Sequence, residues 1–218
     1  MKERGIIFNA EMVRAILDGR KTQTRRIIDW RRTRPTEIAE RDDGSKWPWS
    51  EDCENGGDYW HDCPFGQPGD RLWVRETFAA LEPGSYEQVK PQQGYCQDLR
   101  YSATDRLANS SIDIRGYKWI PSLHMPRWAS RIMLEITGVR VERLQDISEE
   151  DAEAEGIDME ALADAQDCYD CIADHNFTGR PTSAGHFSYL WQSIYGAESW
   201  QANPWVWVVE FRVIENRT

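Results

Sequence analysis

The sequence lacks any long apolar run. Its longest uncharged apolar stretch is the segment 205–209, Trp-Val-Trp-Val-Val, whereas a helix that spans a membrane needs about 20 residues. The amino terminus, Met-Lys-Glu-Arg followed by Gly-Ile-Ile-Phe, has no apolar region long enough for a secretory signal. We therefore expect a soluble, cytoplasmic protein that has no membrane among its partners.

Cysteines are few. The chain has five among 218 residues, an odd number in a sequence without an export signal, so we expect reduced thiols. Cys168 and Cys171 form a single CxxC pair, and with His175 they have the spacing of zinc ligands. They are the candidate ligands of a structural zinc ion, and the alternative is that this isolated pair binds no metal. The chemistry considered below requires no cofactor.

Several familiar catalytic signatures are also missing. The sequence has no Walker loop and no GxGxxG, HExxH or GxSxG motif. The enzyme classes that these motifs define are therefore not indicated, and a function has to come from a less common set of residues.

Basic residues are scarce overall, 26 Lys and Arg against 37 Asp and Glu, which gives a net charge of −11. An acidic protein repels polyanions, so we do not expect it to bind an extended duplex. However, residues 1–35 carry ten Lys and Arg against four acids, whereas residues 140–175 carry 13 acids and two arginines. The basic segment is either a local site for a nucleotide or short single strand, or a solvated face without a ligand.

What is present is a β-rich pattern with a few helices. Alternating apolar residues predict strands, most clearly over 131–144, and the N-cap residues Asn9 and Ser148 predict two helix starts. The predicted class is α+β, one domain over 1–218 with long loop insertions at about 29–68, 79–120 and 158–186. We expect strands near 5–8, 20–28, 71–78, 94–103, 131–144 and 205–214, and helices near 10–18, 149–155, 159–174 and 185–194.

The densest polar cluster follows the first predicted helix, at Lys21, Thr22, Thr24, Arg25 and Arg26. A neutral lysine next to a threonine can accept the hydroxyl proton and so activate a nucleophile. In a strand, Thr22, Thr24 and Arg26 point to one side while Gln23 and Arg25 point to the other. The spacing does not show whether Thr22 or Thr24 would be the nucleophile. The alternative to a catalytic site is an exposed basic strand without a chemical role.

Two acids are candidate partners for this cluster. Glu76 shares a strand face with Leu72 and Val74, and a buried acid needs a partner, often Arg or Lys, so Glu76 is either part of a structural ion pair or a site residue. Glu155 ends the short helix that Ser148 begins, where a carboxylate opposes the helix dipole.

Three segments in this order resemble the ASCH domain family, most closely its longer members encoded by bacteriophages and prophages. They are the stretch 16–26 with Gly-Arg-Lys-Thr-Gln-Thr-Arg-Arg, the stretch 69–76 with Gly-Asp-Arg-Leu-Trp-Val-Arg-Glu, and the stretch 147–157 that follows the strand ending at Leu144. Together with the last strand they cover about half of the chain.

The resemblance implies a PUA-like fold, a mixed β-barrel with flanking helices and a cleft for RNA or a modified nucleoside, in a bacterial host cell. Some small members of the family are amidohydrolases that deacetylate N4-acetylcytidine. Their roles would fall on Thr24 as nucleophile, Lys21 as general base and Glu155 as the acid that orients it. The neighbouring motif residues are assigned to substrate binding: Arg20, Thr22, Arg26, Arg75 and Glu76.

These observations leave three functions open. The first is amide hydrolysis of an N4-acetylcytidine-like substrate, with Glu76 as an alternative to Glu155. The second is a non-catalytic module of phage origin that binds a modified nucleoside, RNA or another single-stranded nucleic acid. The third is a protein-interaction module that uses the acidic segment 140–175.

Overall fold

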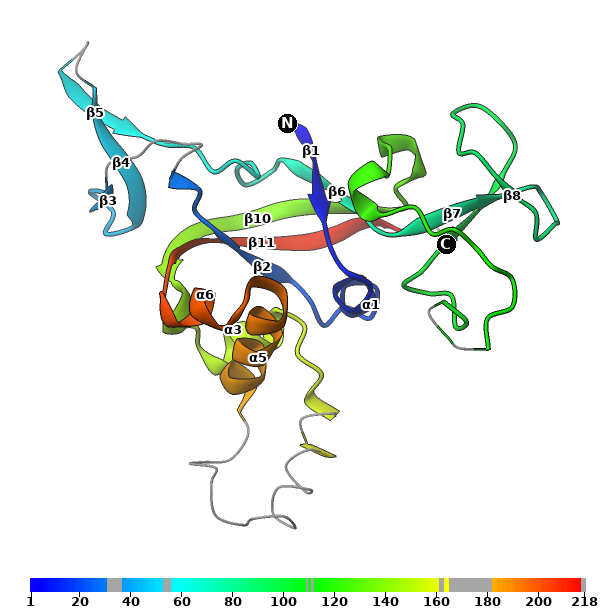
Figure 1. Ribbon diagram of the computed structural model, residues 1–218. Coiled ribbons are helices and arrows are strands. Elements are labelled where there is room, and N and C mark those ends of the chain that lie inside the picture. The colour runs from blue at the N-terminus through cyan, green and yellow to red at the C-terminus, as the bar shows by residue number, and fades with distance from the viewer. Residues whose placement is uncertain are drawn as a thin grey trace. The chain divides into compact units, whose positions relative to one another are not determined.

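The computed structural model describes residues 1–30, 37–52, 56–108, 110, 112–160, 163–164 and 182–216. The chain divides into two compact units (Figure 1). Unit 1 comprises Met1–Asp18, Gly69–Glu135 and Arg212–Thr218, and unit 2 comprises Gly19–Pro68 and Ile136–Phe211. The two longest strands, β10 (Ile132–Arg143) and β11 (Trp205–Asn216), have residues in both units. The single domain expected from the sequence stays a prediction.

Unit 1 is built on a parallel pair of strands. β1 (Glu3–Ile7) pairs with β6 (Arg71–Arg75), and β6 also pairs with β10 in the antiparallel sense. Gly5 lies opposite Trp73, and a Cβ at Gly5 would lie 2.8 Å from the Trp73 ring. Only glycine therefore fits at this position without a shift of the tryptophan.

The helix α1 (Ala10–Leu17) confirms the first predicted helix. The Asn9 side chain accepts a hydrogen bond from the Met12 N–H at 2.8 Å, which satisfies one of the free donors at the helix start. The apolar face of α1 is buried through Val13 and Ile16.

A second sheet of unit 1 falls in the predicted insertion 79–120. Its central strand β7 (Phe78–Leu81) is fully buried and pairs with β8 (Gln88–Val89) and β9 (Asp98–Tyr101). The strand expected near 94–103 is thus present as β9. The short helices η1 (Ser122–His124) and η2 (Arg127–Ala129) follow, and Met125 and Ala129 pack with Phe78 in a small core.

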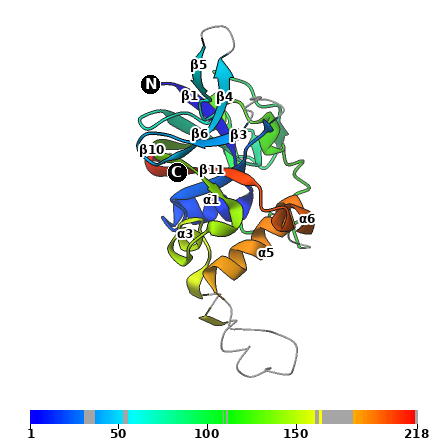
Figure 2. The ribbon, with the colours of Figure 1, turned by 90° about the vertical axis from the view of Figure 1, so that its left-hand side faces the viewer.

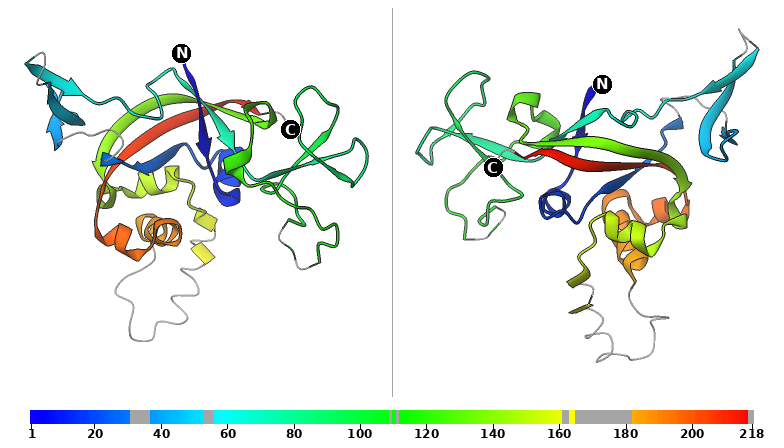
Figure 3. Two further views of the ribbon diagram at one scale, coloured as in Figure 1. Left: turned by 45° about the horizontal axis from the view of Figure 1, so that its top comes forward. Right: turned by 180° about the vertical axis from the view of Figure 1, so that it is seen from behind.

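Unit 2 places three helices against an antiparallel part of the sheet. β11 lies between β10 and β2 (Gln23–Ile27), with Thr24 opposite Val209 (Figure 3, right). The helix α3 (Glu149–Ala154) follows η3 (Leu144–Asp146) and contacts α5 (Ser183–Tyr195), which contacts α6 (Ala197–Gln201) (Figure 2). Phe187 and Trp191 of α5 are buried with Val206 and Val208.

The expectation that 29–68 is a loop is wrong. This segment contains a three-stranded antiparallel sheet of β3 (Glu37–Glu40), β4 (Lys46–Asp52) and β5 (Gly57–Trp60). Its sequence looks like a loop because the strands are short and charged, and because Pro48 lies in the central strand, where proline is unusual. A tertiary contact supports the strand, since the Trp47 ring packs edge-on against Trp207 at 5.0 Å.

The α+β class is confirmed. Several sheets and few helices make up the described part of the chain, and its strands form no closed barrel. No helix among the described residues is both long and apolar enough to cross a membrane. Most of the predicted helix 159–174 and of the insertion 158–186 lies outside the described residues.

Candidate functional site

The predicted catalytic residues Lys21 and Glu155 form a buried ion pair in unit 2. The Lys21 Nζ donates to Glu155 Oε2 at 2.6 Å and to the Glu155 backbone oxygen at 2.8 Å. Lys21 is 1% exposed and Glu155 is 3% exposed. The sequence places them there because Glu155 caps the end of α3, and a backbone bridge then joins Glu155 to Lys21.

The chain around this pair is fixed by backbone geometry. The Thr22 N–H donates to the Ala154 oxygen at 2.8 Å, so the segment before β2 is attached to the last turn of α3. Gly156 follows with a φ of +94°, a left-handed conformation that glycine adopts without strain. This turn ends the helix and directs Glu155 towards Lys21.

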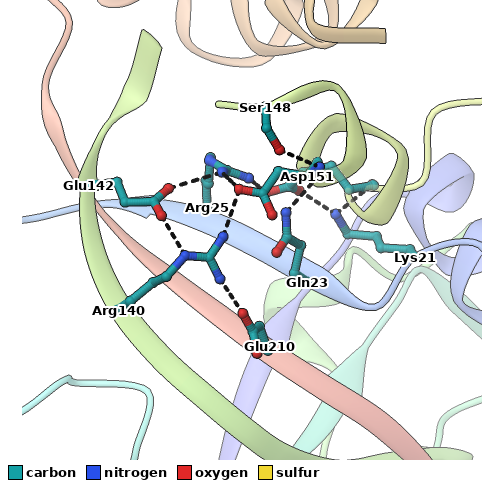
Figure 4. A network of polar contacts seen from close by, with 9 residues as sticks. Lys21, Gln23, Arg25, Arg140, Glu142, Ser148, Asp151 and Glu210 are labelled. Atoms are coloured by element: carbon teal, nitrogen blue, oxygen red, sulfur yellow. Dashed lines mark hydrogen bonds and ion pairs between the residues drawn. The ribbon is translucent and has the colours of Figure 1, made fainter. Parts of the chain in front are cut away.

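Arg25 extends the pair into a network (Figure 4). Its Nη1 donates to Glu155 Oε1 at 3.3 Å, and its Nη2 donates to Asp151 Oδ2 at 2.8 Å and to Glu142 Oε2 at 3.1 Å. Gln23, on the same face of β2, donates to the Asp151 backbone oxygen at 2.7 Å. Side chains on one face of β2 thus hold α3, together with the backbone of Thr22 just before the strand.

Arg140 on β10 forms the outer, more exposed part of the network. Its Nη2 donates to Asp151 Oδ2 at 2.7 Å, its Nε donates to Glu142, and its Nη1 donates to Glu210 of β11. Gly138 lies close by, and a Cβ there would lie 2.5 Å from Glu210 Oε2. Any larger residue at 138 would therefore displace the Glu210 carboxylate.

Charges are nearly balanced in the network. Three cations face four carboxylates: Lys21, Arg25 and Arg140 against Glu142, Asp151, Glu155 and Glu210. The basic segment expected to offer an anion site therefore has Lys21 and Arg25 buried among acids. These two residues present no exposed positive surface to a phosphate.

Burial changes the protonation of this site. Burial lowers the pKa of Lys21, and the attraction of Glu155 opposes that shift without cancelling it. Burial also acts to raise the pKa of Asp151, but hydrogen bonds from Arg140 and Arg25 outweigh it and leave that pKa below its usual value. The site thus combines an acid that stays ionised with an amine that loses its proton more readily than an ordinary lysine.

The structure does not bring Thr24 into the pair. Thr24 is buried, but side chains alternate along a strand, so it lies on the face of β2 opposite to Gln23 and Arg25. No hydrogen bond joins the Thr24 hydroxyl to Lys21 in the part of the chain that the structure describes. Thr22, the other candidate, is exposed.

The other two predicted binding residues of unit 2 flank the pair. The Arg20 Nη1 donates to the Gly156 oxygen at 2.9 Å, so Arg20 supports the turn after α3. Arg26 is half-buried on β2, opposite Trp207. Both lie on the segment that carries Lys21.

Arg75 and Glu76 lie in unit 1. Glu76 is 1% exposed and forms a paired contact with Arg131, Nε to Oε1 at 2.9 Å and Nη2 to Oε2 at 3.0 Å. Burial raises the pKa of Glu76, although Arg131 opposes the shift. The Arg75 guanidinium donates to the backbone oxygens of Ser122 and Leu123. Of the two alternatives for Glu76, the structural ion pair is therefore present.

The candidate zinc ligands Cys168 and Cys171 lie outside the described residues. In the described ranges, no three His, Cys, Asp or Glu side chains are grouped so that they could hold a metal ion. Zinc at the CxxC pair stays a prediction.

Sequence reasoning missed most of the network around Lys21. The sequence patterns assign no chemical role to Gln23, Arg140, Glu142, Asp151 or Glu210. The only sequence signals were that Gln23 and Arg25 share a strand face and that the segment 140–155 is rich in acids, and neither signal pairs the two segments. Arg131, the partner of Glu76, was also missed.

Comparisons with protein-family models, with curated proteins and with solved structures found no match to this chain. The assignment to the ASCH family therefore stays a prediction from the three motif segments.

Proposed function

We propose that the Lys21–Glu155 site belongs to an ASCH-type, PUA-like protein that hydrolyses the amide of an N4-acetylcytidine-like nucleoside. The observation that supports this proposal is the buried pair itself. Its two residues come from the two motif segments to which the resemblance assigns a catalytic lysine and a catalytic glutamate. A lysine with a lowered pKa is also what general-base chemistry needs.

In this reaction, the Thr24 hydroxyl attacks the carbonyl carbon of the amide and its proton passes to neutral Lys21. The C–N bond then breaks, N4 of cytidine takes up the proton, and water releases the acyl group from Thr24 as a carboxylic acid. Glu155 orients the amine. Because Thr24 lies on the opposite face of β2 from Arg25, the reaction requires the segment 21–24 to change conformation when substrate binds.

The decisive experiment follows cytidine release from N4-acetylcytidine by chromatography. We expect release by the wild-type chain and a loss of at least about 100-fold in kcat for Thr24→Ala and for Lys21→Met, as for other general-base and nucleophile removals. Thr22→Ala tests the other threonine, and Ser193→Ala is the matched control, because Ser193 carries an exposed hydroxyl of unit 2 outside the proposed site. Release that survives both active-site variants would refute the roles given to Lys21 and Thr24.

The pH dependence gives a second readout. Lys21 acts as a base only when neutral, so kcat is expected to rise with pH through a pKa that lies below the usual 10.5 of lysine. A rate that falls over this alkaline range in a folded protein would contradict the assignment. Circular dichroism at each pH shows that the protein is folded.

One observation argues against catalysis at this pair and so leaves the second candidate function, a non-catalytic module for RNA or another single-stranded nucleic acid. The Lys21 Nζ is held by two atoms of Glu155, and both residues are buried, which suits a contact that fixes local structure. This candidate predicts no release from any acylated nucleoside. It also predicts binding of a short RNA whose affinity falls steeply with added salt, whereas the affinity for an uncharged nucleoside would not.

A further inference from the structure

A separate pocket in unit 1 is lined by arginines and tyrosines. Its volume is about 760 Å³, which is within the usual range of roughly 300–1,000 Å³ for sites that bind small molecules. Among its lining residues there is one acid, Asp105, and there are four arginines: Arg100, Arg106, Arg115 and Arg131. The chain as a whole has a net charge of −11, so this group of arginines contrasts with the charge of the rest of the protein.

Arg131 is held rigidly at this pocket. Glu76 accepts two hydrogen bonds from it, and the Arg131 guanidinium lies 4.0 Å from the centre of the Tyr101 ring. Its third nitrogen, Nη1, makes no hydrogen bond with any residue in the described ranges. A buried ion pair of this kind contributes little net stability, because desolvation offsets the attraction. The ion pair with Glu76 instead fixes the orientation of the Arg131 guanidinium plane.

Arg115, another lining residue, is also fixed by ion pairs and by an aromatic ring. Asp105 accepts from its Nη1 and Nη2 at 2.8 and 2.9 Å, and Asp113 accepts from its Nε and Nη2 at 2.8 Å. The Arg115 guanidinium lies 4.6 Å from the centre of the Tyr117 ring. The pocket therefore contains two preformed stacks of arginine on tyrosine, and the Arg115–Tyr117 stack, whose arginine side chain is 18% exposed against 8% for Arg131, has the flat surface that an aromatic ligand can reach.

Arg100 and Arg106 supply charge that is not neutralised. Both are exposed, and neither forms an ion pair with any residue that the structure describes. Tyr86, 73% exposed, adds a third aromatic side chain to the lining. The combination of flat stacking surfaces with free guanidinium groups fits a ligand that carries both an aromatic ring and an anion.

We propose that this pocket is a nucleotide-binding site in which a base stacks on the Arg115–Tyr117 pair and a phosphate is bound by Arg100 and Arg106. The proposal concerns unit 1 and does not depend on the function proposed for Lys21. The phosphate belongs either to a free nucleotide or to a nucleic-acid strand.

The test is calorimetric titration of the full chain with AMP, CMP, adenosine, inorganic phosphate and a hexaadenylate RNA. We expect AMP or CMP to bind at least about 10-fold more tightly than adenosine or phosphate, because stacking and phosphate contacts each add affinity. The RNA shows which ligand carries the bound phosphate. If the RNA binds more tightly than AMP, the ligand is a nucleic-acid strand, and if it binds equally or more weakly, the ligand is a free nucleotide. Failure of both AMP and CMP to bind at millimolar concentration overturns the proposal.

Variants separate the two parts of the site. Arg100→Gln with Arg106→Gln is expected to weaken AMP binding about 10-fold at low salt, with a smaller effect at high salt. Tyr117→Leu is expected to weaken it by a similar factor at both salt concentrations. Arg127→Gln is the matched control, since Arg127 is an exposed arginine of unit 1 outside the lining. An effect of Arg127→Gln equal to that of the paired substitution overturns the phosphate assignment.

Further results test whether the nucleotide site of unit 1 is independent of the site at Lys21, and whether the phosphate and the base each contribute to binding. Lys21→Met is expected to leave AMP binding unchanged while it abolishes any deacylation, so each proposal is able to fail alone. If adenosine binds as tightly as AMP, the phosphate contacts are refuted. If inorganic phosphate binds as tightly as AMP, the stacking surfaces are refuted.

Discussion

Arg25 and Arg140 each bond three carboxylates, yet solvent reaches only one of them. Arg25 bonds Glu142, Asp151 and Glu155 with a side chain that is 0% exposed, whereas Arg140 bonds Glu142, Asp151 and Glu210 with a side chain that is 31% exposed. Water can replace the bonds of an exposed arginine but not those of a buried one. The two residues therefore form a matched pair that differs in burial.

We expect Arg25→Met to lower the free energy of unfolding by about 3 kcal/mol, because it removes one of the two cations that contact the buried Glu155 carboxylate. Arg140→Met is expected to cost only about 1 kcal/mol, since solvent screens the acids that it releases. Urea denaturation of both variants measures the difference. Equal losses would show that burial does not set the strength of this network.

At the scale of elements, α3 is a short helix that carries Asp151 and positions Glu155. It has only six residues, which is too few for a helix to be stable alone, so its caps and its contacts have to hold it. The Ser148 hydroxyl caps its first turn by accepting from the Asp151 N–H at 3.1 Å. The geometry of the Lys21–Glu155 pair thus depends on a capping residue seven positions before Glu155.

Ser148→Ala is expected to destabilise the protein by about 1 kcal/mol through loss of this cap. Ser148→Asp is expected to restore most of that stability, because aspartate also accepts the hydrogen bond and favours the positive end of the helix. Thermal unfolding of the three proteins compares them. A Ser148→Asp variant as unstable as Ser148→Ala would indicate that the hydroxyl acts through some contact other than the cap.

Local signals predicted the elements well, and distant contacts were not predictable. The caps at Asn9 and Ser148 and the alternation over 131–144 located α1, α3 and β10, because each signal lies within a few residues of its effect. The partners of Arg25, by contrast, lie 117–130 residues away, and no local pattern encodes them. Glu76 lies between these cases: its apolar strand face predicted burial and a cationic partner, but not Arg131 itself.

In the candidate site too, local patterns predicted which residues of the strand 23–27 share a face but did not predict all of their contacts. Alternation correctly placed Gln23 and Arg25 on one face, which is confirmed by their bonds to Asp151. The resemblance to the ASCH family selected Lys21 and Glu155, which the structure brings together, and Thr24, which alternation places on the other face. Sequence patterns therefore identified the segment and its acid, while the geometry between Lys21 and Thr24 needs the experiment described above.

At the scale of the whole molecule, acidic groups govern how stability depends on pH. At neutral pH the net charge is −11, so the folded chain repels itself, and this repulsion weakens as pH falls towards the sequence pI of about 4.9. The pKa of buried Glu76 is raised above 4.5, so its proton binds more readily in the folded state and stability is lost as pH rises through that pKa. Both effects favour a mildly acidic optimum.

Acids whose pKa values are lowered in the folded protein set the lower end of the pH range in which the protein is stable. Arg115 lowers the pKa of Asp105 by a hydrogen bond, and the pKa of Asp151 is also below its usual value. The stability that these ionised acids contribute is complete above the unfolded pKa of about 3.8 and is lost as pH falls through their lower folded values. Acid unfolding is therefore expected below about pH 3.8 and not near the pI.

We expect the melting temperature to be highest between about pH 4.5 and 6, and to fall both towards neutral pH and below about pH 3.8. Asp151→Asn is expected to be less stable at neutral pH and to show a shallower fall in acid, because the group that takes up the proton is gone. Asp105→Asn makes the same comparison in unit 1. Melting temperatures measured from pH 3 to 8 by circular dichroism decide the matter, and a steady decline from pH 8 down to pH 4 would show that ionised pairs outweigh both the repulsion of the net charge and the burial of Glu76.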